Sequence, residues 1–385
     1  MTGRVTAYIG ARIHDGLQFL EDHALVVSAS DGFRVKPVAE LPTDIQAEYL
    51  NGGLITPGFV DLQVNGGGGV MFNDAPSVEA LRVMADAHTQ LGTAAFLPTL
   101  ITDTPDKSQA AIDAVKAAIA DGLPGIVGIH LEGPHLSIAR KGAHDPTLIR
   151  PMDDTDLARL VKAAEHLPNV LVTIAPENTT LEQIRKMADA GILVSLGHTD
   201  ADHATCHAAF DAGARCVTHL FNAMSQLGSR EPGLVGATLE RGDIHAGLIA
   251  DGIHVNPATI RVALAAKPNS DRIFLVTDAM ATAGSTLDRF QLNGRDVLRQ
   301  DNRLTLADGT LAGAHLSLPQ AIANIANKVG GGLDNAVARA TSTPASLLRD
   351  CGGAGRFDAT TRFANYFRDI ANDPSVTMQI FARQA

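Results

Sequence analysis

Between Ile55 and Asp278 the chain alternates short apolar runs with alanine-rich stretches of helical period, and this alternation constrains its fold more than any other feature. The apolar runs lie near residues 55–62, 93–100, 125–132, 169–176, 192–198, 215–219, 246–250 and 272–278. The stretches that we expect to be helical cover residues 77–91, 105–121, 153–167, 180–190, 201–213 and 256–266. Buried strands that alternate with helices form parallel βα units, and eight such units close a barrel. The sequence therefore predicts an α/β chain built on a (β/α)8 TIM-type barrel.

The segments that flank these runs have a different pattern. Residues 1–56 hold short alternating runs separated by turn residues, which predict small antiparallel strands. After the eighth run, residues 286–313 predict a hairpin, and residues 317–329 and 334–349 predict two helices. The tail 354–385 returns to strand-like runs, which we expect to pair with the N-terminal strands.

An open, doubly wound sheet is the alternative to a barrel. It would need a glycine-rich dinucleotide-binding turn, and the glycines 66–69 do follow a predicted strand. They lack the G-x-G-x-x-G spacing, however. We therefore interpret them as a turn in which the backbone approaches the active site closely.

Charge and composition exclude several classes of partner. The chain has 42 acidic and 31 basic residues, a net charge of −11, which repels both nucleic acid and anionic membranes. Its N-terminus has no signal-peptide core, and no apolar stretch approaches the length of a membrane span. The three cysteines form no CxxC pattern and predict no disulfide framework. We expect a cytoplasmic protein that binds a small molecule.

Four chemically capable residues stand where apolar runs end: Glu132, His198, His219 and Asp278. The C-terminal strand ends form the catalytic face of a barrel, so we expect the four side chains to share one pocket. One carboxylate and two imidazoles leave a fourth position open, which is the pattern of a hydrolytic zinc site. Asp278 would then serve as general base and later as general acid. The alternatives are that the histidines are hydrogen-bonded packing residues and that Asp278 only orients one of them.

Nine motifs occur in order between about residues 51 and 345. They are Pro57–Gly66, His130–Pro134, Lys141–His144, Gly197–Thr199, Thr218–Met224, Arg230–Gly233, Ala250–His254, Val276–Ala279 and Gly309–Gly313. Their order and spacing resemble the N-acetylglucosamine-6-phosphate deacetylases of the amidohydrolase superfamily. The resemblance implies hydrolysis of the acetamide of N-acetylglucosamine 6-phosphate to glucosamine 6-phosphate and acetate, in amino-sugar catabolism.

The resemblance also implies an architecture and a cofactor. It predicts that residues 1–56 and 346–385 form one small β-sandwich and that residues 57–345 form the catalytic barrel. It implies a homodimer and a divalent metal ion. Zn²⁺ is the expected ion, although Fe²⁺ or Co²⁺ would also suit two imidazoles and one carboxylate.

Substrate contacts follow from the same resemblance. His144 is expected to polarise the amide carbonyl, as a donor to the oxyanion that forms. The other expected contacts are Ala143, Asn222, Ala223, Arg230, His254, Leu311, Ala312 and Gly313. Arginine suits a phosphate because its planar fork bonds two oxygens at once. Arg230 would act either in its own subunit or from the neighbouring one. The basic stretch 140–144 would be a mobile lid or a solvated loop.

The sequence departs from the superfamily at Gln63 and Asn65, where most amidohydrolases carry His-x-His and bind a second metal. Neutral amide oxygens are poor zinc ligands, so we predict a single ion. Two other functions stay open: deacetylation of N-acetylgalactosamine 6-phosphate or a related sugar phosphate, and a non-catalytic barrel that serves assembly.

Two further histidines have a spacing that can chelate a metal. His203 and His207 lie four residues apart on one predicted helix face. They lack the glutamate of a metalloprotease motif and follow a strand that already supplies His198, so we interpret them as helix surface. His315 stands where the family usually has a small residue, and the sequence offers no physical reason for it.

Overall fold

An eight-stranded parallel sheet forms the centre of the protein. The computed structural model describes residues 5–28, 31–358, 360–361 and 363–381. Its barrel strands are β8 (Phe59–Val64), β11 (Thr93–Ile101), β12 (Ile129–Glu132), β13 (Val170–Ile174), β14 (Leu193–Leu196), β15 (Cys216–Val217), β16 (His245–Leu248) and β17 (Ile273–Leu275), paired in this order. A parallel bridge between Val64 and Ala279, and a 3.0 Å hydrogen bond from the Asp278 amide to the Gln63 carbonyl, join the last strand to the first. The (β/α)8 barrel is confirmed.

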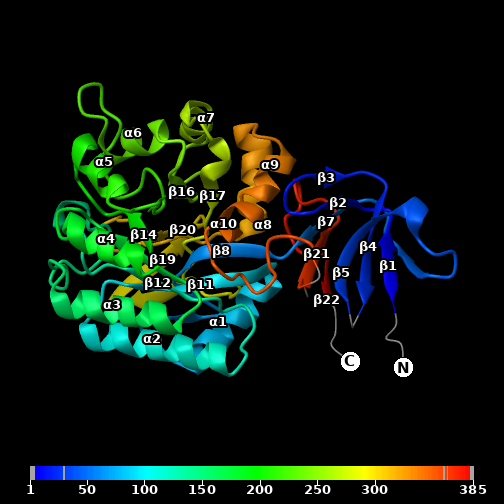
Figure 1. The fold of residues 1–385 in the computed structure, drawn as a ribbon, viewed down its shortest axis with the longest axis horizontal. Coiled ribbons are helices and arrows are strands. Elements are labelled where there is room, and N and C mark those ends of the chain that lie inside the picture. The colour runs from blue at the N-terminus through cyan, green and yellow to red at the C-terminus, as the bar shows by residue number, and fades with distance from the viewer. Residues whose placement is uncertain (1–4, 29–30, 359, 362, 382–385) are drawn as a thin grey trace.

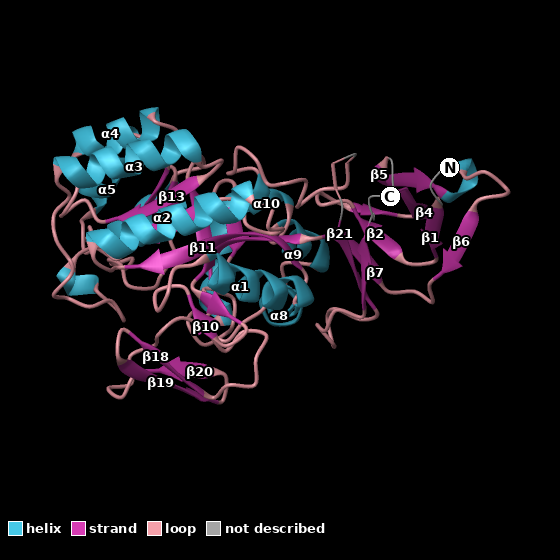
Figure 2. Cartoon of the chain, turned by 90° about the horizontal axis from the view of Figure 1, so that it is seen from below, coloured by secondary structure: helices cyan, strands magenta, loops and turns pink. Residues whose placement is uncertain are grey.

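Helices surround this sheet on the outside (Figures 1 and 2). They are α1 (Val78–Gln90), α2 (Pro105–Ala120), α3 (Asp154–His166), α4 (Leu181–Asp189), α5 (His203–Asp211), α6 (Gly233–Glu240), α7 (Pro257–Ala266) and α8 (Leu318–Asn324). Most begin after a side chain that accepts a hydrogen bond from the first turn, as Ser77, Thr104 and Asp153 do. The sequence does not predict α6, because no side chain caps it and it begins with a glycine.

The first apolar run, 55–62, is two strands rather than one. β7 (Leu54–Pro57) belongs to a separate sheet, and β8 begins the barrel. Gly58 lies between them, and a Cβ there would stand 2.2 Å from the Ala94 Cβ atom, so only glycine allows this crossing.

The two chain ends together build a small second lobe. One sheet has the order β5-β4-β1-β6, from β5 (Gly32–Pro37), β4 (His23–Ser28), β1 (Thr6–Ile9) and β6 (Gln46–Tyr49). The other has the order β22-β21-β7-β2-β3, and adds β22 (Met378–Phe381), β21 (Phe363–Phe367), β2 (Arg12–His14) and β3 (Phe19–Leu20) to β7. Leu25 and Phe33 of the first sheet pack with Ile55 and Ile380 of the second. The blue and red strands therefore share one sandwich in Figure 1, as predicted.

The C-terminal helices differ in detail from the expectation. The segment 317–329 is α8 followed by a π-helical turn, Ile325–Val329. The segment 334–349 holds two short helices, α9 (Leu333–Ala338) and α10 (Ser342–Ala345), instead of one. Arg362, which belongs to the tail 354–385 predicted to hold strands, lies outside the described residues.

The predicted hairpin has three strands, β18 (Arg289–Leu292), β19 (Arg295–Gln300) and β20 (Arg303–Thr305), which project to one side of the barrel (Figure 2). Its apolar side chains pack against Met71, Ile101 and Met280. His315 fastens it to the barrel, because its ring nitrogens contact Thr282 Oγ1 at 3.0 Å and Arg299 Nη1 at 3.3 Å.

The turn of glycines 66–69 forms β9 (Gly66–Gly67), which pairs with β10 (Val70–Met71). A Cβ at Gly66 would stand 2.4 Å from the Val70 carbonyl oxygen, so the backbone does approach closely. It approaches Val70 and Ala281 rather than the active-site cavity, and that part of the interpretation is wrong.

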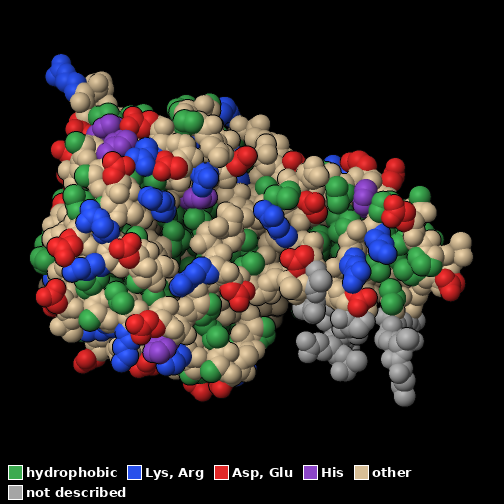
Figure 3. Space-filling view, viewed as in Figure 1, with side chains coloured by type: hydrophobic (Ala, Val, Ile, Leu, Met, Phe, Trp, Pro, Cys, Tyr) green, Lys and Arg blue, Asp and Glu red, His purple; other side chains and the backbone are tan. Residues whose placement is uncertain are grey.

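The surface of the protein carries charges of both signs. Figure 3 shows acidic and basic side chains interspersed over the drawn face of both lobes. Within the described residues, no helix is long and apolar enough to cross a membrane.

Candidate active site

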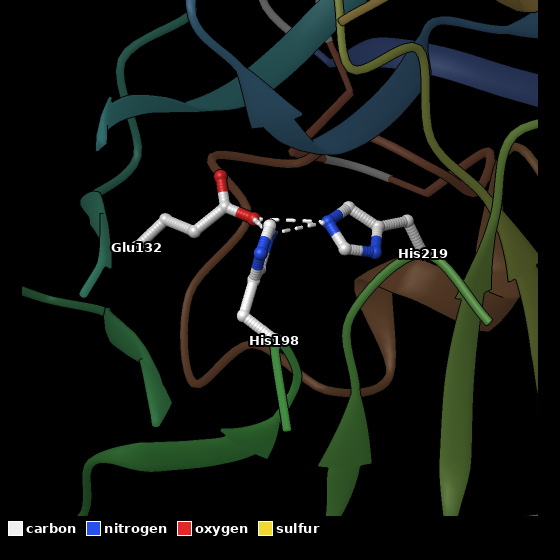
Figure 4. A group of neighbouring side chains, drawn as sticks. All are labelled: Glu132, His198 and His219. Carbon is white, nitrogen blue, oxygen red and sulfur yellow. Dashed lines mark hydrogen bonds and ion pairs between the residues drawn. The ribbon is translucent and has the colours of Figure 1, made fainter. Parts of the chain in front are cut away.

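Glu132, His198 and His219 point toward one another from the C-terminal ends of β12, β14 and β15, with β13 between the first two of these strands (Figure 4). His198 Nε2 lies 3.2 Å, and His219 Nε2 lies 3.0 Å, from Glu132 Oε1, and the two Nε2 atoms are 3.1 Å apart. The three residues are only 2%, 4% and 5% exposed, respectively. The sequence predicted this convergence, which the topology produces by aligning the C-terminal ends of the strands.

This group fits a divalent ion. Ligands about 2.0–2.1 Å from a tetrahedral zinc ion stand about 3.4 Å from each other, close to the separations found here. His198 Nδ1 lies 2.9 Å from the Arg140 carbonyl oxygen, which can only accept, so Nδ1 carries the proton and Nε2 keeps its lone pair. A cation between them would satisfy lone pairs gathered so closely in a buried place.

The backbone at these strand ends is strained. His198, His219 and Asp278 adopt positive φ angles of 48°, 31° and 50°. Residues with a Cβ rarely occupy this left-handed region, and such strain gathers at functional sites, where the surrounding fold holds it in place. The left-handed backbone at these three residues directs each side chain over the C-terminal end of the barrel.

The surroundings of Glu132 and Asp278 shift the pKa values of these two carboxyl groups in opposite directions. Burial opposes ionisation of Glu132, but the adjacent imidazole rings of His198 and His219 outweigh burial and hold the pKa of Glu132 well below its usual range. Asp278 differs, because burial and the nearby Glu132 charge raise its pKa to about 6. A carboxyl group poised near neutrality is suited to take up and return a proton.

Gln63 and Asn65 act as hydrogen-bond donors to these carboxylates. Asn65 Nδ2 lies 2.7 Å and Gln63 Nε2 lies 3.1 Å from Asp278 Oδ1. Gln63 Nε2 also lies 3.3 Å from each Glu132 oxygen. Both amides therefore orient Asp278, and Gln63 also contacts Glu132.

His144 is buried beside the metal-ligand candidates, at 3% exposure, so the solvated-loop alternative is wrong. Its ring centroid lies 4.4 Å from that of His198. The Thr102 amide, which can only donate, contacts Nδ1 at 3.4 Å, so we place the proton on Nε2. Burial and the neighbouring histidine charges lower the pKa of His144 well below its usual value. A neutral ring with one N–H is a suitable donor to a developing oxyanion.

A cavity of about 370 Å³ opens above this group. Of the expected contacts, it is lined by Ala143, His144, Asn222, Ala223, His254, Leu311 and Gly313, together with Asn65 and Asp278. His254 is oriented by Asp251, whose Oδ2 lies 2.6 Å from its Nδ1. Arg140 also lines the cavity and pairs with Asp200 at 2.7 Å.

Two expected contacts do not reach this cavity. Ala312 is completely buried beneath it. Arg230 is exposed on the loop before α6 and does not line the cavity of its own chain.

The sequence missed one wall of the cavity. This wall is apolar and consists of Ile101, Ile249, Met280 and Leu292. Ile101 ends β11 and Leu292 ends β18, whereas Ile249 and Met280 lie in the segments after β16 and β17. Ile101, Met280 and Leu292 pack together with the hairpin, and Ile249 belongs to the core of the barrel. No local sequence pattern marked these four residues as the lining of a cavity.

Comparisons with known proteins agree with this geometry. The model of the amidohydrolase family matches residues 54–350. An N-acetylgalactosamine-6-phosphate deacetylase of Shewanella sp. (strain ANA-3) is 42% identical over 88% of this chain and 87% of its own. An N-acetylglucosamine-6-phosphate deacetylase of Haemophilus influenzae is 36% identical over 89% of each chain. The solved N-acetylglucosamine-6-phosphate deacetylase of Pasteurella multocida superposes with a TM-score of 0.91 at 32% identity, over 99% of both chains.

A parallel barrel with two imidazoles and two carboxylates at its strand ends defines a metal-dependent hydrolase of the TIM-barrel class. The chain belongs to the amidohydrolase family, in the group that holds the N-acetylated hexosamine 6-phosphate deacetylases.

Proposed function

We propose that this enzyme hydrolyses the acetamide of N-acetylglucosamine 6-phosphate, releasing acetate and glucosamine 6-phosphate, in the cytoplasmic breakdown of amino sugars. The convergence of Glu132, His198 and His219 within 3.2 Å, with Asp278 beside them, carries the proposal. The names of the relatives support the choice of substrate class.

The chain's own groups divide the chemical work. Glu132, His198 and His219 would hold one divalent ion, which supplies Lewis-acid polarisation and lowers the pKa of a water toward neutrality. Asp278 takes the proton of the attacking water and returns it to the departing nitrogen. His144 donates a hydrogen bond from its Nε2–H group to the carbonyl oxygen as negative charge develops there, and keeps its proton. Gln63 and Asn65 keep Asp278 aimed at the reacting atoms.

The sugar phosphate occupies the cavity away from the ion. The backbone amide of Ala223 and the His254 ring offer donors in the cavity, and Asn222 lines it while its Nδ2 donates to the His219 and Leu220 carbonyls. Arg230, exposed and outside its own cavity, would reach the phosphate of the partner subunit in a homodimer. Arg230→Ala is then expected to weaken binding of the phosphorylated sugar and leave binding of the unphosphorylated sugar unchanged. Equal weakening of both, or of neither, contradicts the assignment.

N-acetylgalactosamine 6-phosphate is the second candidate substrate. The relative with 42% identity carries that activity in its name, which favours this candidate specifically. The two sugars differ only in the configuration of one hydroxyl group, and both fit the same chemistry.

Acetate release from both sugar phosphates, measured on protein of known metal content, tests the proposal. We expect release from at least one of them, with the ratio of kcat/KM values identifying the preferred sugar. Release from neither, with an ion bound, would exclude the proposed function.

A further inference from the structure

A second group of metal-capable side chains lies outside the barrel, where α5 packs against α6. His203 and His207 share one face of α5, and Glu240 is the last residue of α6. His203 Nε2 lies 3.2 Å, and His207 Nε2 lies 2.5 Å, from the same oxygen, Glu240 Oε1. The sequence showed the histidine pair without a third ligand, and the fold supplies one from a helix that the sequence did not predict.

We propose that His203, His207 and Glu240 form a second, exchangeable site for a zinc-like divalent ion. Their three ligand atoms lie within 4.8 Å of one another, and the two imidazole centroids are 4.5 Å apart. Two imidazoles and one carboxylate suit Zn²⁺, Ni²⁺ or Co²⁺. The side chains are 30%, 24% and 53% exposed, so water can complete the coordination.

Among the described residues, no lysine or arginine forms an ion pair with Glu240. Arg241 follows Glu240 directly, but its guanidinium is held by Asp211 and Asp243, at 2.8 Å each. Asp202 caps the start of α5 and adds a further negative charge nearby. The surroundings therefore favour a cation.

A bound ion would reinforce a link that already exists. Glu231 Oε1 accepts from the His203 amide at 2.7 Å and from the Gly233 amide at 3.0 Å, which ties the start of α5 to the start of α6. An ion between His203 and Glu240 would tie the start of α5 to the end of α6 as well. Binding would stabilise this helix pair and the loop that carries Arg230.

Calorimetric titration with Zn²⁺ alone, on dialysed full-length chain that keeps its tightly held ion, tests the proposal. We expect one further equivalent to bind, with a rise in Tm of about 2 °C or more at saturation. His207→Gln and Glu240→Gln should each weaken this binding about 10-fold or more, since each removes one of three ligands. Both should keep the wild-type rate of acetate release.

His166→Gln provides the matched control, because His166 is an exposed histidine at the end of α3 with no acidic partner among the described residues. It should bind the further equivalent as the wild type does. Circular dichroism checks that the variants fold, and two independent variants guard against one that does not. Equal uptake by the wild type, His207→Gln and Glu240→Gln would overturn the proposal, as would no further uptake by the wild type into the millimolar range. The comparison between variants is independent of the chemistry in the inner cavity.

Discussion

The inner and outer groups have the same donor set, two imidazoles and one carboxylate, in very different surroundings. Glu132, His198 and His219 are at most 5% exposed and lie at strand ends, two of them with left-handed backbone. The outer histidines and Glu240 are 24% to 53% exposed and lie on helices. Ligand type alone therefore does not define a catalytic centre. A buried base, orienting amides and a cavity are also needed, and only the inner group has them.

Replacing the glutamate of each group by glutamine should show the largest difference between the inner and outer groups. Glu132→Gln should lose the tightly held ion and lower kcat by about 10³-fold or more, because several kcal/mol of transition-state stabilisation is lost. Glu240→Gln, the matched outer variant, should change kcat by less than about 2-fold. Acetate release and elemental analysis measure both effects. Similar losses in both variants would show that the groups act together.

Replacement of Asp278, the proposed general base, should have the next largest effect on kcat. Asp278→Asn should lower kcat by about 10²-fold or more and keep the ion, because the amide can accept hydrogen bonds but cannot take up a proton. The metal content and the rate, measured on one sample, check this. Near wild-type turnover would exclude the role.

The oxyanion donor comes third. His144→Gln should lower kcat by about 10-fold to 10²-fold and change KM little, since the donor acts mainly when negative charge develops on the carbonyl oxygen. Steady-state kinetics separate the two constants. A change confined to KM would make His144 a binding residue.

A third buried carboxylate shows what burial does without imidazole partners. Asp61 is completely buried, and burial raises its pKa from 3.8 to about 7 despite hydrogen bonds from Thr277. The folded chain therefore holds a proton that the unfolded chain releases above about pH 4, and stability falls as pH rises from there to about 7. Asp61→Asn removes the charge, and its single oxygen can still accept from the Thr277 amide.

This variant should exceed the wild type in unfolding free energy at pH 8 by on the order of 1 kcal/mol, and the gain should shrink at about pH 5. Urea unfolding at the two pH values measures it. A gain that does not depend on pH would mean that the charge of Asp61 is not the cause.

The inner site could be predicted from the sequence to a larger extent than the outer one. Glu132, His198, His219 and Asp278 could be placed together from sequence, because each follows a buried run and parallel strands end on one face. The outer site could not be completed, since Glu240 belongs to a helix without a capping signal. The apolar wall and the exclusion of Arg230 from its own cavity depend on how loops pack over the barrel, which no local pattern encodes.

The central claim is that one tightly held divalent ion lies among Glu132, His198 and His219 beside Asp278. Anomalous diffraction from crystals of zinc-loaded protein tests it most directly. The account predicts a strong peak within bonding distance of Glu132 Oε1 and the two Nε2 atoms, and none beside Gln63 and Asn65. A peak at the amides, or none among the three ligands, would contradict it.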